Sequence, residues 1–100
     1  MPRLIYTENA GRNIQRVADF WRDTPEVGKK AITSILQNIK KLEQFPHIGK
    51  PFAEDDGKTR ILFIPFGASS YVARYQFNVA HDTVRILSIR HAREAGFTED

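Results

Sequence analysis

The sequence contains no cysteine, and its 100 residues include one methionine and one tryptophan. Without cysteine the chain has no disulfide framework and no thiolate metal site, as expected of a protein from a reducing cytoplasm. No apolar run approaches the roughly 18 residues of a membrane-spanning helix, and the first residues lack the apolar stretch of a signal peptide. These absences predict a soluble, cytoplasmic protein with no membrane segment.

The motifs of several common sites are also missing. There is no glycine-rich phosphate loop, no His-x-x-x-His pair and no Gly-x-Ser-x-Gly turn. The three histidines, His47, His81 and His91, are scattered along the chain. Three adjacent acids at 54–56 have no partner histidine, so they are more typical of a solvated loop than of a metal site. We therefore predict neither a metal nor a cofactor.

Basic residues predominate in the region of the predicted strands, from Gly57 to Arg93. The formal net charge is +3, and 41% of the residues are hydrophobic, enough for one core in a single domain over residues 1–100. Between Gly57 and Arg93 six basic residues stand against the single acid Asp82. This basic region predicts attraction to phosphates or to an acidic protein surface, unless its charges serve solubility alone.

The first half of the chain has the pattern of a short strand followed by two helices. Residues 3–6 are β-prone, and Thr7 can cap a helix whose apolar stripe runs to Trp21. Thr24 and Pro25 start a second helix, which ends before Phe45-Pro46 because proline moves its predecessor out of the α region. A break of a few residues joins the two helices, so we expect an antiparallel helical hairpin.

Three strands follow the helices. A loop with two prolines comes first, in which Gly49 can adopt a positive φ. Residues 60–66 form a strand that is broken near its end by Pro65, residues 70–79 alternate as a second strand, and residues 83–91 form the last. In the last strand Leu87 and Ile89 are expected on the opposite face from Val84 and Ile86. That strand should therefore be central and buried on both faces.

These elements predict an α+β fold of order β-α-α-β-β-β. Short turns make the last three strands an antiparallel meander, and the helical hairpin packs on one face of a four-stranded, mainly antiparallel sheet. The other face stays available for a partner. Residues 92–100 form a polar tail.

The candidate site is the arginine-rich sheet with His91 where its last strand ends. The candidate partner-binding residues are Lys50, Arg60, Arg74, Arg90, His91 and Arg93. Ribonucleolytic cleavage needs a base, an acid and cations for the phosphorane charge, and His91, Arg60 and Arg93 could supply them. His91 could equally be structural, bonded to the backbone, and arginines bind acidic proteins as well as phosphates. Composition leaves both possibilities open.

The order of several motifs resembles the RelE/ParE superfamily of toxins from type II toxin–antitoxin modules. The motifs are Pro46-x-x-Gly49-Lys50-Pro51, Arg60 opening a strand, Tyr71-Val72-x-x-Tyr75, and Val84-x-Ile86-Leu87-x-Ile89-x-His91-x-Arg93. The resemblance covers about residues 3–93. It implies a small cytoplasmic toxin that is neutralised by a cognate antitoxin whose C-terminal segment wraps over it.

The resemblance leaves two targets. ParE-like members inhibit DNA gyrase and need no catalytic residues, while RelE-like members cut mRNA in the ribosome with basic residues and a tyrosine or histidine near the C-terminus. The Gly-Lys-Pro and His-x-Arg motifs, and the lack of tyrosine after Tyr75, favour the ParE-like branch, with growth inhibition and plasmid stabilization as implied roles. Lys50 departs from the arginine of many relatives. An inactive relative that binds the antitoxin alone is a third possibility.

Overall fold

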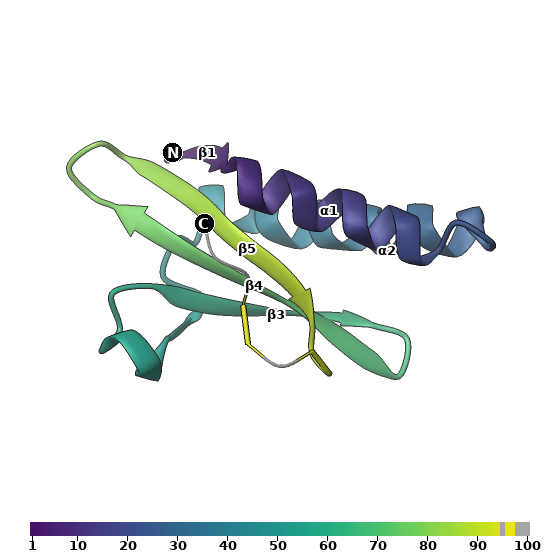
Figure 1. The fold of residues 1–100 in the computed structure, drawn as a ribbon. Coiled ribbons are helices and arrows are strands. Elements are labelled where there is room, and N and C mark those ends of the chain that lie inside the picture. Colours follow the sequence, from purple (N-terminus) through teal and green to yellow (C-terminus); the bar gives the residue numbers. More distant parts are fainter. Residues whose placement is uncertain (95, 98–100) are drawn as a thin grey trace.

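The computed structural model describes residues 1–94 and 96–97, with two helices on one side of a twisted sheet (Figure 1). The helices are α1 (Glu8–Phe20) and α2 (Pro25–Lys40), with 3-10 turns at η1 (Lys41–Glu43) and η2 (Ala53–Asp55). The strands are β1 (Arg3–Tyr6), β2 (Lys50–Pro51), β3 (Arg60–Phe66), β4 (Ser69–Asn78) and β5 (Thr83–His91).

The sheet has the order β1-β5-β4-β3-β2. The pair β1/β5 is parallel and the other pairs are antiparallel, so β5 lies inside the sheet as expected. The predicted α+β class, element order and helical hairpin are confirmed. The sequence missed β2, a two-residue strand that pairs with the start of β3 and makes the sheet five-stranded.

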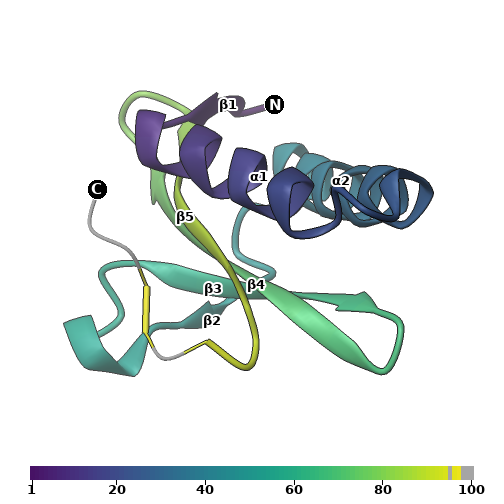
Figure 2. The same ribbon diagram turned by 45° about the vertical axis from the view of Figure 1, so that its right-hand side comes forward.

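Local signals in the sequence define the starts of both helices. The Thr7 side chain accepts a hydrogen bond from the Ala10 N–H at 3.2 Å and so satisfies one of the unpaired donors of the first turn of α1. Proline opens α2 at a position where its missing N–H costs nothing. Thr24 makes no side-chain capping bond there, so Pro25 marks the start of α2. Both helices cover the same face of the sheet (Figure 2).

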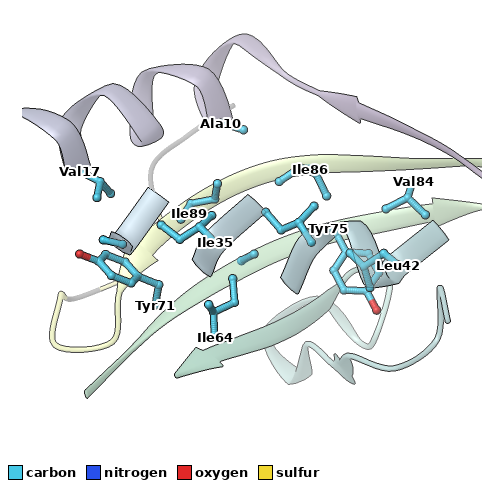
Figure 3. Packing of buried hydrophobic residues seen from close by; sticks show 13 residues of the cluster. Ala10, Val17, Ile35, Leu42, Ile64, Tyr71, Tyr75, Val84, Ile86 and Ile89 are labelled. Atoms are coloured by element: carbon cyan, nitrogen blue, oxygen red, sulfur yellow. The ribbon is translucent and has the colours of Figure 1, made fainter. Parts of the chain in front are cut away.

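The hydrophobic core fills the space between the helical hairpin and the sheet. Its buried members are Ala10, Val17, Ala31, Ile35, Ile39, Leu42, Ile64, Tyr71, Ala73, Tyr75, Val84, Ile86 and Ile89. Figure 3 shows Val17 and Tyr71 at one end of this cluster and Leu42 and Tyr75 at the other. Removing this apolar surface from water, at about 25 cal/mol per Å², is the main favourable term of folding.

A β-bulge changes which residues of β5 face the core. Ile86 pairs with Tyr75 and Ser88 pairs with Arg74, so Leu87 is the extra residue. A bulge shifts the two-residue alternation by one, and Ile89 therefore returns to the face that Val84 and Ile86 occupy. The expected placement of Ile89 opposite Val84 and Ile86 is wrong for this reason.

Beyond the end of β1, side chains of helix α1 form hydrogen bonds with the outer edge of β5. The pairing of β1 with β5 stops at Ile86. The buried Asn9 amide donates to the Leu87 carbonyl at 2.9 Å, and the Asn13 side-chain oxygen accepts from the Ile89 N–H at 2.8 Å. Because an unpaired buried backbone group is costly, these side chains fix α1 against the strand.

Two expectations about single residues are corrected. Strand β3 continues through Pro65, which pairs with Ser70. On its other side β3 meets β2 only at Arg60 and Ile61, so the missing N–H interrupts no second ladder. Gly49 is not among the glycines with positive φ, which are Gly57, Gly67 and Gly96.

In the described part of the chain, no helix is long and apolar enough to cross a membrane.

Candidate functional site

The predicted site residues lie in two separate regions of the sheet. Arg60 stands opposite Tyr75 on β4, whereas His91 stands opposite Tyr71. Four residues of a strand correspond to about 13 Å, and β4 also separates β3 from β5. Lys50 is exposed next to Arg60, on β2. The nuclease hypothesis required Arg60 and His91 to lie in one catalytic centre. Their positions in the sheet are too far apart for that.

Arg60 holds the loop that precedes β2. One nitrogen of its guanidinium donates to the His47 carbonyl at 3.2 Å and to the Gly49 carbonyl at 2.7 Å. Tyr75 fixes the same loop from within the core, since its hydroxyl accepts from the Gly49 N–H and donates to the Pro46 carbonyl, both at 2.9 Å. Burial raises the pKa of Tyr75, which keeps the phenol protonated as a donor.

Arg74 and Arg90 lie on the face of the sheet that the helices leave uncovered. One Arg90 guanidinium nitrogen donates to the carbonyls of His91, Ala92 and Glu94, and the guanidinium lies 4.6 Å from the Phe97 ring centroid. The Arg74 guanidinium is 5.7 Å from the same ring. Phe97, within the predicted polar tail, thus lies over the open face of the sheet, and these cation–π contacts help to hold it there. Residues 95 and 98–100 of that tail lie outside the described residues.

The open face is also contacted by the segment after β2. Phe52 makes an edge-to-face contact with Phe97 at 5.6 Å, and its ring centroid is 6.0 Å from the Arg74 guanidinium. The segment is shaped by Asp56, at φ 58°, and Gly57, at φ 79°. The open face available to a partner is therefore smaller than the sequence suggested.

The acidic turn 54–56 gives a prediction for pH. Desolvation raises the pKa of Asp55, but hydrogen bonds from the Thr59 hydroxyl and from the Thr59 and Lys58 backbone N–H groups, with the charge of Arg74, outweigh it and hold the pKa below its usual range. A carboxylate with a lowered folded-state pKa stabilises the protein above its unfolded pKa of about 3.9, and this contribution disappears as pH falls through the folded value.

We therefore expect Asp55→Asn to lower the free energy of unfolding at pH 7, with a difference from wild type that shrinks below about pH 4. Urea unfolding at pH 7, 4 and 3 measures this. Glu54→Gln is the matched control, because the exposed Glu54 makes no side-chain hydrogen bond with the residues that the structure describes. A constant difference for Asp55→Asn across this range would contradict the prediction.

Within the described residues no three acidic or histidine side chains are placed to hold a metal.

A hollow in the surface lies between α1 and the end of β5. It has a volume of about 650 Å³. Its lining residues are Asn13, Arg16, Val17, Phe20, Trp21, Tyr71, Ile89, Arg90, His91, Arg93 and Glu94, and we call this space the α1–β5 pocket. The sequence pointed to Arg90, His91 and Arg93 but missed Arg16, Phe20 and Glu94. Phe20 could have been noticed, because it is a large apolar residue outside the apolar stripe of its helix.

His91 is held firmly at the wall of this pocket. Its Nδ1 accepts a hydrogen bond from the Arg93 N–H at 3.1 Å, and its ring packs edge-to-face on Tyr71 at 5.3 Å. Tyr71 in turn accepts a hydrogen bond from the Trp21 indole at 3.1 Å. An Nδ1 that accepts carries no proton, so the neutral ring has its proton on Nε2 and can only donate there.

Glu94 closes the other side of the pocket. One carboxylate oxygen accepts a hydrogen bond from the backbone N–H of His91 at 3.0 Å, and the other forms an ion pair with the Arg16 guanidinium. The side chains of Arg16 and Glu94 are 49% and 43% exposed. The carboxylate thus contacts both walls, at a position that solvent reaches.

Comparisons with known proteins agree with this architecture. The family model described as "ParE toxin of type II toxin-antitoxin system, parDE" matches residues 4–96. The fold is similar to the chromosomal ParDE toxin–antitoxin system from P. aeruginosa, with TM-score 0.73, 22% identity, and coverage of 91% of this chain and 96% of that chain. It is also similar to the toxin–antitoxin complex RelBE2 from Mycobacterium tuberculosis, with TM-score 0.64, 21% identity, and coverage of 91% and 99%. No curated protein matches the sequence.

Proposed function

We propose, since this chain belongs to the ParE toxin family of type II toxin–antitoxin systems, that it is a cytoplasmic toxin that inhibits DNA gyrase. A cognate antitoxin neutralises it. In this proposal the protein binds gyrase through its surface and catalyses no reaction. It needs no metal and no cofactor.

The observation that carries the choice of gyrase over RNA cleavage is the use of the arginines within the fold. Arg60 and Arg90 donate to backbone carbonyls at 2.7–3.2 Å, and Arg60 lies far along the sheet from His91. A ribonuclease needs several cations converging on one phosphate and a base with a free lone pair. The Nδ1 lone pair of His91 is occupied by the Arg93 N–H. This arrangement supports a binding protein.

The antitoxin part of the proposal has separate support. The two solved structures compared above are described as a toxin–antitoxin system and a toxin–antitoxin complex. The net charge of +3 and the cations around the α1–β5 pocket favour an acidic, amphipathic partner segment.

One observation favours the alternative of a ribosome-dependent mRNA endoribonuclease. His91 and Arg93 line the same pocket, so an imidazole and a cation of the kinds that RNA cleavage uses lie together there. The two functions differ in what they predict for His91.

A gyrase supercoiling assay with purified, antitoxin-free protein tests the proposal. We expect the wild type to inhibit supercoiling and to accumulate cleaved DNA, and His91→Ala to keep this inhibition within about tenfold, whereas loss of a general acid or base costs about 10²–10⁴-fold. His81→Ala, at an exposed turn, is the matched control. No inhibition by the wild type, combined with ribosome-dependent mRNA cleavage that His91→Ala abolishes in a folded protein, would replace this function by the alternative.

A further inference from the structure

We propose that Glu94 is an internal ligand of the α1–β5 pocket, and that an acidic antitoxin segment with a large apolar side chain displaces it on binding. This inference rests on the proposed function for the identity of the partner. It adds the place where that partner binds and a residue of the toxin that competes with it.

The floor of the pocket is apolar and open to solvent. Phe20 is 75% exposed, although a large aromatic side chain gains much by burial. It contacts Trp21 edge-to-face at 4.9 Å, and the Trp21 indole is fixed by its bond to Tyr71. Exposed aromatic residues above rigid neighbours are typical of binding hot spots. A partner's apolar side chain in this space would bury both rings.

The rim of the pocket selects an acidic partner. Its cations are Arg16 and Arg93, against the single acid Glu94. Arg90 also lines the pocket, but its guanidinium is bonded to backbone carbonyls and lies against Phe97. Arg93 is exposed and forms no ion pair with any residue that the structure describes. A cationic rim around an apolar floor fits a peptide in which a carboxylate follows an apolar anchor.

Glu94 already makes the contacts that such a carboxylate would make. Its carboxylate accepts a hydrogen bond from the backbone N–H of His91 at the outer edge of β5 and forms an ion pair with the Arg16 guanidinium on α1. The neighbouring donor on that edge, the Ile89 N–H, is buried and bonded to Asn13, so it is closed to a partner. Ion pairs as exposed as Arg16–Glu94 contribute little stability and are easily exchanged. The pocket thus contains a carboxylate of the chain itself, Glu94, that a partner can displace.

Isothermal titration of the full-length variants with the antitoxin encoded beside the toxin gene tests this inference. We expect Phe20→Ala to weaken the affinity at least about fivefold, as hot-spot truncations do. Arg16→Gln weakens it by a similar factor. Glu94→Gln tightens it about two- to fivefold, because the competing ion pair is lost. In the Arg16→Gln background Glu94→Gln has a smaller effect, since Glu94 and the partner then compete only for the His91 backbone N–H.

Each variant has a matched control away from the pocket. Phe45→Ala removes another exposed phenylalanine, 57% exposed, after α2. Arg12→Gln breaks the Arg12–Glu8 pair on the same helix, and Glu43→Gln breaks the Lys40–Glu43 pair. These controls should bind the antitoxin like the wild type.

The outcomes separate this inference from the proposed function. Antitoxin binding by the wild type with Phe20→Ala and Arg16→Gln indistinguishable from their controls would overturn the pocket assignment and leave the proposed function intact. Unchanged or weaker binding by Glu94→Gln would overturn the role of Glu94. A wild-type protein that binds no antitoxin and does not inhibit gyrase would instead overturn the proposed function. Self-association that Phe20→Ala abolishes, with antitoxin affinity unchanged, would assign the pocket to a second copy of the chain.

Discussion

Gly49→Ala is expected to lower the free energy of unfolding by about 2–4 kcal/mol, the range of severe overpacking. A Cβ at position 49 would lie 2.7 Å from the Tyr75 ring and hydroxyl and 2.8 Å from the Ile61 carbonyl oxygen. Tyr75 is fully buried and the Ile61 oxygen belongs to the backbone of β3, so neither can move aside cheaply. The substitution also disturbs the bond from the Gly49 N–H to Tyr75.

Gly11→Ala is the matched control. Gly11 lies in α1 with nothing within 4 Å of an added Cβ, so alanine there should stabilise the protein by about 0.5–1 kcal/mol through its higher helix propensity. Urea unfolding followed by circular dichroism measures both variants. Equal stability of Gly49→Ala and the wild type would mean that the loop at 46–51 can leave Tyr75 without cost.

This glycine illustrates what the sequence could predict and what it could not. The Pro46-x-x-Gly49-Lys50-Pro51 motif predicted a loop, which is correct up to Gly49, while Lys50–Pro51 form β2. Its glycine was attributed to backbone conformation. The cause is a tyrosine 26 residues later, whose hydroxyl occupies the space of a side chain. Contacts over that distance leave no local pattern.

Local signals in the sequence predicted the helices and the longer strands well. Thr7, Pro25 and the alternation along β4 each act within a few residues of the chain, and each predicted the element that the structure contains. The bulge at Leu87 does not follow from its own neighbours, because it depends on how β4 pairs with β5. The two-residue β2 is too short for any periodic pattern.

The candidate site was predicted in part. Residue types identified a basic cluster, and the structure brings Arg90, His91 and Arg93 to one pocket. Charge alone could not reveal that Arg60 and Arg90 donate to backbone carbonyls, nor that Glu94 contacts the His91 N–H and Arg16 in the pocket. Hydrogen-bond partners decide whether an arginine is available, and these partners emerge with the fold.

Asn13→Ala is expected to lower the free energy of unfolding by about 1–3 kcal/mol, the cost of a buried donor left without a partner. The Asn13 oxygen accepts from the Ile89 N–H at 2.8 Å, and Asn13 is 4% exposed, so water cannot simply replace it. The higher helix propensity of alanine offsets at most about 0.7 kcal/mol of this loss. Gln15→Ala, on the exposed side of the same helix, should stay within about 0.5 kcal/mol of the wild type.

Amide hydrogen exchange gives this prediction a local readout. Loss of Asn13 frees the outer edge of β5, so the Ile89 amide should exchange faster in Asn13→Ala than in Gln15→Ala under the same conditions. Because Asn13 and Ile89 both line the α1–β5 pocket, a partner that binds there should restore part of the protection. Unchanged exchange at Ile89 would show that β5 keeps its edge closed without α1, and the helix would then position the pocket by apolar packing alone.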